Sequence, residues 1–308
     1  MSRALPVLTA AALVGCCNVT WAVPRVDATK SELEVLWERY WQKDDLTVGE
    51  CAKLIRHYSP LVRTWAAYSL GRRGEAAMPV VMEALRDPDP RVRRAGLDAI
   101  AGPVALGTGG RRDKHKMTPE IVAQAVPLIA ENLKHEDLWV RDGALLAFMV
   151  TGKYGEKYLP QIMEYLATDE DWWLRDAAAR AIGGLGKDHA QEAIVPLAEA
   201  YVRETHVVAQ RKMKEALFQL DLEAGAHLVL PIFVEALRNP TKHKMYDAWY
   251  FRSMTLDVLE KMGPSAKGAA PAIRELIDEY EQDRTQPDVE ARIERLQQAL
   301  DAVTGGEQ

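Results

Sequence analysis

The chain has 308 residues, of which 48% are hydrophobic and 27% are charged, and its formal net charge is −6. This is the composition of a folded protein, and it excludes disorder over most of the length. Binding to nucleic acid depends on clustered lysine and arginine. An acidic chain is therefore not expected to bind DNA or RNA.

The first 22 residues are typical of an export signal, and we assign residues 1–22 to it. The apolar run Ala4–Gly15 is too short to span a bilayer as a helix. Two cleavage sites fit: Leu13–Cys16 resembles a lipobox, which would leave a lipid on Cys16, and Thr20–Ala22 resembles an ordinary signal-peptidase site. The signal predicts an exported protein that is periplasmic, lipid-anchored or secreted. Contact with a membrane is expected only through the lipid.

Residues 23–45 are expected to form a tether and an N-terminal helix. Ser31 and Glu34 have the spacing of a capping box, and apolar and aromatic residues follow at helical spacing. Such a helix would close one end of the repeats described below. Beyond it, Cys51 is the only cysteine, so a buried free thiol is expected there and no disulfide.

Residues 46–304 contain an internal repeat. Six amphipathic segments begin with a proline, at Pro79, Pro127, Pro160, Pro196, Pro231 and Pro271. An apolar residue followed by arginine opens a second pattern rich in small residues, at Arg63, Arg93, Arg141 and Arg175, with Arg252 and Arg292 in corresponding places. The spacing between the two patterns fits two helices per unit and excludes a parallel sheet.

Side-chain caps mark the start of the second helix in each unit. Ser59 and Asp89 each precede a proline, and Asp137, Asp171 and Asp288 stand four residues before an arginine. A side-chain acceptor at the N-cap followed by proline at the first helical position is a helix-start signal. Small residues after the caps, such as Ala177 and Ala178, would let helices of adjacent units approach closely.

The pattern Asp-x-x-Val-Arg leading into Ala-x-x-Ala-Leu/Ile-Gly resembles HEAT repeats, in particular the PBS-lyase-like subgroup, and Arg175–Gly186 is its clearest copy. The resemblance implies an all-α solenoid, or superhelix, of about seven HEAT-like helix pairs with the N-terminal capping helix at one end. It also implies a ladder of Asp and Arg side chains between neighbouring units. The residues in position to form this ladder are Asp89, Arg93, Asp137, Arg141, Asp171 and Arg175.

No motif in the sequence indicates catalysis. The seven histidines include no pair three or four residues apart, and neither a P-loop nor a Gly-x-Ser-x-Gly elbow is present. We therefore expect a chain that is not an enzyme, with no cofactor and no metal site.

Aromatic residues recur at the first turn of three second helices. Trp139, Trp173 and Tyr250 each stand two residues before an arginine, and Trp172 and Trp249 precede two of them. Such rings dominate binding hot spots, which suggests a partner-binding surface, but they also suit packing between neighbouring units. The sequence leaves both interpretations open.

Two connections are longer than a repeat of this kind needs, Pro103–Thr118 and Asn239–Ala248. Long insertions in a repeat array are often functional. The features together predict a scaffold or adaptor of the bacterial cell envelope that binds a protein partner. A second hypothesis is an accessory subunit of an exported enzyme or carbohydrate-handling complex, in which the aromatic residues contact a glycan.

Overall fold

The computed structural model describes residues 46–71, 73–105, 117–168, 171–187, 190–285 and 288–306. The export signal, Cys16 and the capping helix expected within 23–45 lie outside the described residues. Within the described part, the regular structure is helical and contains no strand. None of the helices in these ranges is both long and apolar enough to cross a membrane.

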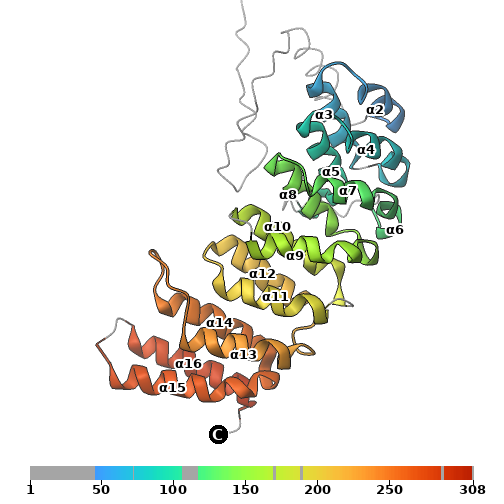
Figure 1. Cartoon of the computed structure of the whole chain (residues 1–308). Coiled ribbons are helices and arrows are strands. Elements are labelled where there is room, and N and C mark those ends of the chain that lie inside the picture. Colours follow the sequence, from blue (N-terminus) through green and yellow to red (C-terminus); the bar gives the residue numbers. More distant parts are fainter. Residues whose placement is uncertain are drawn as a thin grey trace, which may run out of the picture. The chain divides into compact units, whose positions relative to one another are not determined.

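The helices follow one another in pairs (Figure 1). The first helices of the pairs are α2 (Val48–Leu54), α4 (Met78–Ala84), α7 (Val126–Asn132), α9 (Leu159–Thr168), α11 (Ala190–Arg203), α13 (Ala226–Arg238) and α15 (Ala270–Gln282). The second helices are α3 (Pro60–Leu70), α5 (Pro90–Ala105), α8 (Leu138–Phe148), α10 (Trp172–Leu185), α12 (Val207–Gln219), α14 (Ala248–Met262) and α16 (Val289–Thr304). The predicted all-α solenoid of helix pairs is confirmed.

Short helical segments lead into several first helices. The four-residue helix α6 (Pro119–Val122) precedes α7, and 3₁₀ turns are η3 (Gly74–Ala77), η4 (Ala123–Ala125), η5 (Gly152–Tyr158) and η7 (Gly263–Ala269). Four of the six repeated prolines occupy the second position of a first helix, where a missing N–H costs nothing. Pro196 and Pro231 instead lie inside α11 and α13, which begin earlier than the sequence suggested.

The chain divides into two compact units, residues 1–117 and 118–308. In the first unit, α2 packs on α4 and α3 packs on α5. In the second, α9, α11, α13 and α15 pack in order, and α10 lies between α8 and α12. The division falls in the long connection Pro103–Thr118, most of which lies outside the described residues.

Small residues bring neighbouring second helices together. Ala177 and Ala178 are fully buried, as the sequence predicts. The closest approach to a neighbouring backbone is at Gly184 of α10, where a Cβ atom would lie 2.4 Å from the carbonyl oxygen of Met149. Cys51 is also fully buried, and burial raises the pKa of its thiol to about 11. The predicted buried thiol is therefore confirmed.

Most of the predicted caps form, and two do not. Asp89, Asp137 and Asp171 each accept a hydrogen bond from the backbone N–H two residues on. Ser59 makes no side-chain cap bond, and Asp288 has a left-handed backbone (φ 56°) and makes none either. Ser59 does stand at the N-cap before Pro60 in an extended backbone like that of Asp137, but its predicted side-chain bond does not form, and nothing in the structure explains its absence. At Asp288 the left-handed backbone replaces the extended geometry of the other caps, so the predicted cap bond is wrong there as well.

Candidate functional site

Capping geometry places two indoles at the same turn of adjacent second helices. Asp137 Oδ1 accepts from the N–H groups of Trp139 and Val140 at 2.8 and 3.2 Å. Asp171 Oδ1 accepts from the N–H of Trp173 at 2.9 Å. Because both caps fix the start of the helix in the same way, Trp139 and Trp173 are each the second residue of their helix, on α8 and α10.

The rings of this region contact one another across three repeats. The centroids of Trp139 and Trp173 lie 6.0 Å apart in an edge-to-face arrangement, and Trp172 stacks on Trp173 at 4.0 Å. On its other side, Trp172 stacks on His206 at the start of α12, with centroids 3.5 Å apart. The structure therefore brings together three of the five aromatic residues singled out in the sequence.

These rings are only half-buried. The next residue after His206 is Val207, whose side chain is 48% exposed. We call Trp139, Trp172, Trp173, His206 and Val207 the aromatic edge. Its rings pack between repeats and are also partly exposed to solvent, so the packing is observed and partner binding stays a prediction.

Charged groups beneath the aromatic edge hold it in place. Glu204 accepts from the backbone N–H groups of Thr205 and His206, both at 2.8 Å. Burial by itself would raise the pKa of Glu204, but hydrogen bonds from Arg175 and from these N–H groups outweigh burial and leave the pKa below its ordinary value. Burial lowers the pKa of His206, and the charge of Glu204 offsets part of that effect. The lowered pKa favours the neutral form of the His206 imidazole that stacks on Trp172.

The other two predicted aromatic residues face different neighbours. Counted from the cap Asp247, Trp249 and not Tyr250 is the second residue of α14. Tyr250 stacks on Tyr246 at 4.4 Å, and its hydroxyl donates to Gln210 Oε1 at 3.3 Å. Burial raises the pKa of the Tyr250 phenol. Neither residue is part of the aromatic edge.

Trp249 lies instead against α15 and α16. Its ring is 5.6 Å from that of Tyr280, edge to face, and the guanidinium carbon of Arg292 lies 5.4 Å from its centroid. Together with the loop between α13 and α14, these side chains line a groove of about 720 Å³. This groove is a second surface of the second unit, separate in its residues from the aromatic edge.

The described residues contain no group of three or more His, Cys, Asp or Glu side chains arranged to hold a metal ion.

The family models that match the sequence agree with the repeats seen in the structure. A family model of HEAT repeats matches residues 29–101 and 49–122, and a second model, of the HEAT repeat, matches residues 159–189. The latter segment spans α9 and α10, the pair that carries Trp172 and Trp173. The chain is a HEAT-repeat protein. Among curated proteins, no relative of its sequence is found.

Solved structures agree on the fold of this HEAT-repeat protein. The archaeal HEAT-like repeats protein from Thermococcus onnurineus NA1 is similar with a TM-score of 0.51 at 15% identity, over 85% of this chain and 100% of that one. A chain of the Kap95:Nup1 complex is similar with a TM-score of 0.54 at 12% identity, over 90% of this chain and 38% of that one. At these sequence identities, the similarity to the two structures shows a shared fold and nothing further.

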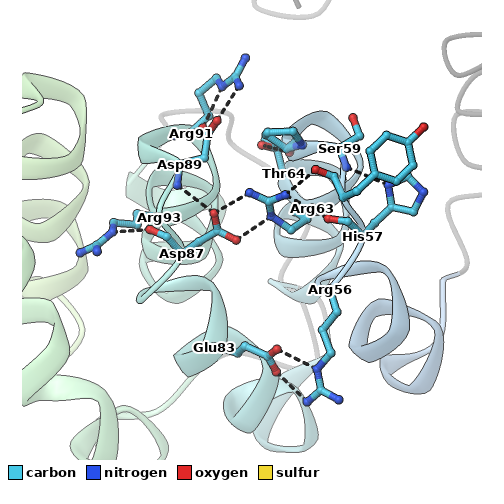
Figure 2. A network of polar contacts seen from close by, with 12 residues as sticks. Arg56, His57, Ser59, Arg63, Thr64, Glu83, Asp87, Asp89, Arg91 and Arg93 are labelled. Atoms are coloured by element: carbon cyan, nitrogen blue, oxygen red, sulfur yellow. Dashed lines mark hydrogen bonds and ion pairs between the residues drawn. The ribbon is translucent and has the colours of Figure 1, made fainter. Parts of the chain in front are cut away.

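Ion pairs connect consecutive HEAT repeats in both units. Figure 2 shows the first: Arg63 of α3 donates from Nε and Nη2 to the two carboxylate oxygens of Asp87, at 2.7 and 2.9 Å. In the second unit, Arg175 of α10 donates from Nε and Nη2 to Glu204, at 2.6 and 2.8 Å. In each pair the arginine of one repeat reaches the loop that precedes the second helix of the next.

The acids of these pairs are not the ones expected from the resemblance. Asp87 and Glu204 stand two residues before the N-cap positions Asp89 and His206. A carboxylate at the N-cap faces the N–H groups of its own helix, as seen for Asp89, Asp137 and Asp171. The residue two places earlier faces the preceding repeat, which is why it receives the arginine.

The expected ladder arginines also differ from one another. Arg93 donates from Nε to the carbonyl of Asp87 in its own loop, and Arg141 donates to the carbonyls of His135 and Glu136. Arg175 forms the inter-repeat ion pair. The sequence contained a signal for the two acids, because Asp87 and Glu204 stand at the same repeat position.

Sequence reasoning also missed several residues of the two surfaces. His206 takes part in the aromatic edge, and Tyr246, Tyr280 and Arg292 line the groove. The loop Asn239–Ala248, which contains Tyr246, was recognised as an insertion, and the structure confirms a loop there between α13 and α14. Of its neighbours, Arg292 of α16 was recognised as a repeat arginine but not as part of a groove, and Tyr280 of α15 carries no repeat signal in the sequence.

Proposed function

We propose that this HEAT-repeat protein is a non-catalytic scaffold of the bacterial cell envelope that binds a protein partner through the aromatic edge. HEAT-repeat solenoids are commonly protein-interaction scaffolds, because stacked repeats present an extended surface. The proposal rests on one observation. Three tryptophans from two adjacent repeats are half-buried and contact one another, and Trp172 stacks on His206, which precedes the 48% exposed Val207 in the chain.

Such a surface has the features of a binding hot spot. The rings are already held by one another and by the caps Asp137 and Asp171, so binding would order few new rotamers. Tryptophan is enriched among the residues that contribute most to protein interfaces. Helices of adjacent repeats can pack together through alanine or valine side chains alone. Three indoles at this position are therefore more than packing requires.

The test uses Val207→Asp, which removes apolar surface from the aromatic edge without opening a cavity. An acidic residue in the first turn of a helix is also favourable for the helix itself. Leu228→Asp is the matched control, because Leu228 is 37% exposed and also lies in the first turn of a helix, α13. Both variants are expected to melt like the wild type.

The tagged full-length chain and both variants would be incubated with envelope extract, and the captured proteins quantified. Loss of an anchoring contact costs about 2 kcal/mol or more, so Val207→Asp is expected to lose a partner that wild type and Leu228→Asp retain. Equal capture by all three proteins would mean that the aromatic edge is not the binding surface.

The envelope location is supported by the export signal in residues 1–22 and is tested separately. Cell fractionation of the full-length chain is expected to find it outside the cytoplasm. Replacement of Cys16 by Ser is expected to move the protein from the membrane to the soluble fraction if the lipobox is used, and to leave it unchanged if cleavage follows Ala22. Recovery of the uncleaved chain from the cytoplasm would contradict export.

A further inference from the structure

The groove beside Trp249 is walled by a loop whose shape is fixed by its own contacts. The loop joins α13 to α14 and projects beyond the ends of both helices (Figure 1). The hydroxyl of Thr241 donates to the carbonyl of Val202 on α11 at 2.6 Å, and the N–H of Met245 donates to His243 Nδ1 at 3.2 Å. A wall that is already ordered costs little conformational entropy when a ligand binds.

The floor of the groove is also rigid. Arg292 lies between two rings, with its guanidinium carbon 5.4 Å from the centroid of Trp249 and 5.8 Å from that of Tyr280. Arg252 donates to the carbonyl of Leu237 at 2.9 Å and to the hydroxyl of Tyr280 at 3.2 Å. Stacked cations and rings of this kind hold the apolar faces in fixed positions.

The charges of the groove are balanced on its floor and unbalanced at its rim. Each of its three arginines has a carboxylate within 4 Å, in the pairs Arg238–Glu275, Arg252–Glu279 and Arg292–Asp247. The two lysines of the loop, Lys242 and Lys244, are exposed and form no ion pair with any described residue. Next to them, the side chain of Met245 is 80% exposed. Lys242 lines the groove, whereas Lys244 and Met245 follow it in the same loop outside the lining. Lys242 therefore adds an uncompensated positive charge to the groove, in a chain whose net charge is −6.

We propose that this groove binds an extended acidic segment of a protein partner. Carboxylates of the segment pair with Lys242 in the groove and with Lys244 in the same loop, and an apolar side chain of the segment packs on Trp249. Asp247 and Glu279 also line the groove, and their carboxylates can accept N–H groups of an extended peptide backbone. The inference rests on the proposed scaffold function and adds a second contact, of stated chemistry, to it.

The same two carboxylates distinguish a peptide from other polyanions. A nucleic acid offers phosphates at every step and depends on many lysine and arginine contacts, whereas here two lysines are uncompensated and two acids line the same groove. A neutral glycan would make no use of the lysines. An acidic peptide matches both signs of charge, because it carries carboxylates on its side chains and N–H donors on its backbone.

The experiment measures fluorescence anisotropy of a short labelled peptide in which glutamates flank one phenylalanine, titrated with the full-length protein. Lys242→Glu/Lys244→Glu is the test variant. Lys261→Glu/Arg274→Glu is its control, since both residues are exposed on α14 and α15, form no ion pair with a described residue, and the change in net charge is the same. All four side chains lie on the surface, so folding should be unaffected.

We expect the test variant to weaken binding of the peptide by about tenfold or more, because two favourable surface charges become unfavourable ones. The control should weaken it by less than about twofold. A peptide with glutamine in place of glutamate should bind far more weakly.

Four results would overturn the proposal: no saturable binding of the glutamate peptide, equal binding of the glutamine peptide, equal losses in test and control variants, or equally tight binding of a single-stranded oligothymidylate. None of these results depends on Val207. Failure of the groove is therefore distinguishable from failure of the aromatic edge, which is judged by capture with Val207→Asp.

Discussion

Replacement of Arg175 by Met should destabilise the second unit strongly, because it leaves Glu204 as a buried carboxylate without its cation. The side chain of Glu204 is 1% exposed and that of Arg175 is 19% exposed. Removal of one partner from a buried ion pair costs about 3–5 kcal/mol. Two backbone N–H groups continue to donate to Glu204 at 2.8 Å, so we expect the lower end, about 3 kcal/mol.

The matched control is Arg141→Met, at the same position of the preceding repeat in the same unit. Arg141 donates to the carbonyls of His135 and Glu136, at 2.9 and 2.8 Å. These carbonyls lie near solvent, so the loss should be about 1 kcal/mol. In a protein of this size about 1 kcal/mol lowers the melting temperature by about 2–4 °C. Thermal unfolding followed by circular dichroism should separate the two variants clearly.

The pH dependence gives a second check on the same reasoning. The folded-state pKa of Glu204 lies below its ordinary value of 4.5, so its stabilising effect is present above pH 4.5 and is lost as the pH falls through the lowered pKa. The deficit of Arg175→Met should therefore be full at neutral pH and shrink in acid. An Arg175→Met protein that melts no earlier than Arg141→Met, or a deficit that is the same at every pH, would refute the buried ion pair.

Two further predictions concern local packing and capping. Gly184→Ala should lower the free energy of unfolding by about 1–3 kcal/mol, because its Cβ would lie 2.4 Å from the backbone of Met149. Gly183→Ala is the control and should cost less, because its Cβ meets the movable end of a glutamine side chain. Equal melting temperatures of the two variants would contradict the close approach at Gly184. Asp137→Ala should cost about 1 kcal/mol through the lost bonds to two backbone N–H groups, and an unchanged urea midpoint would show that the cap contributes nothing.

The sequence determined the architecture because the signals for it are local. A proline at the second position and an aspartate at the N-cap act on the helix that they begin, and each recurs in several repeats. The small residues after the caps, such as Ala177, predicted the close helix packing for the same reason. The first-turn position of Trp139 and Trp173 also followed from cap spacing alone.

Only the tertiary structure decided what these first-turn side chains meet. Trp172 stacks on His206 at the start of α12, whereas Trp249 contacts Tyr280 of α15 and Arg292 of α16. Arg175 likewise selects Glu204 over the expected cap residue. A cap and a proline act within one helix, but a ring contact or an ion pair depends on the distance and angle between helices of different repeats, which no single segment of sequence encodes.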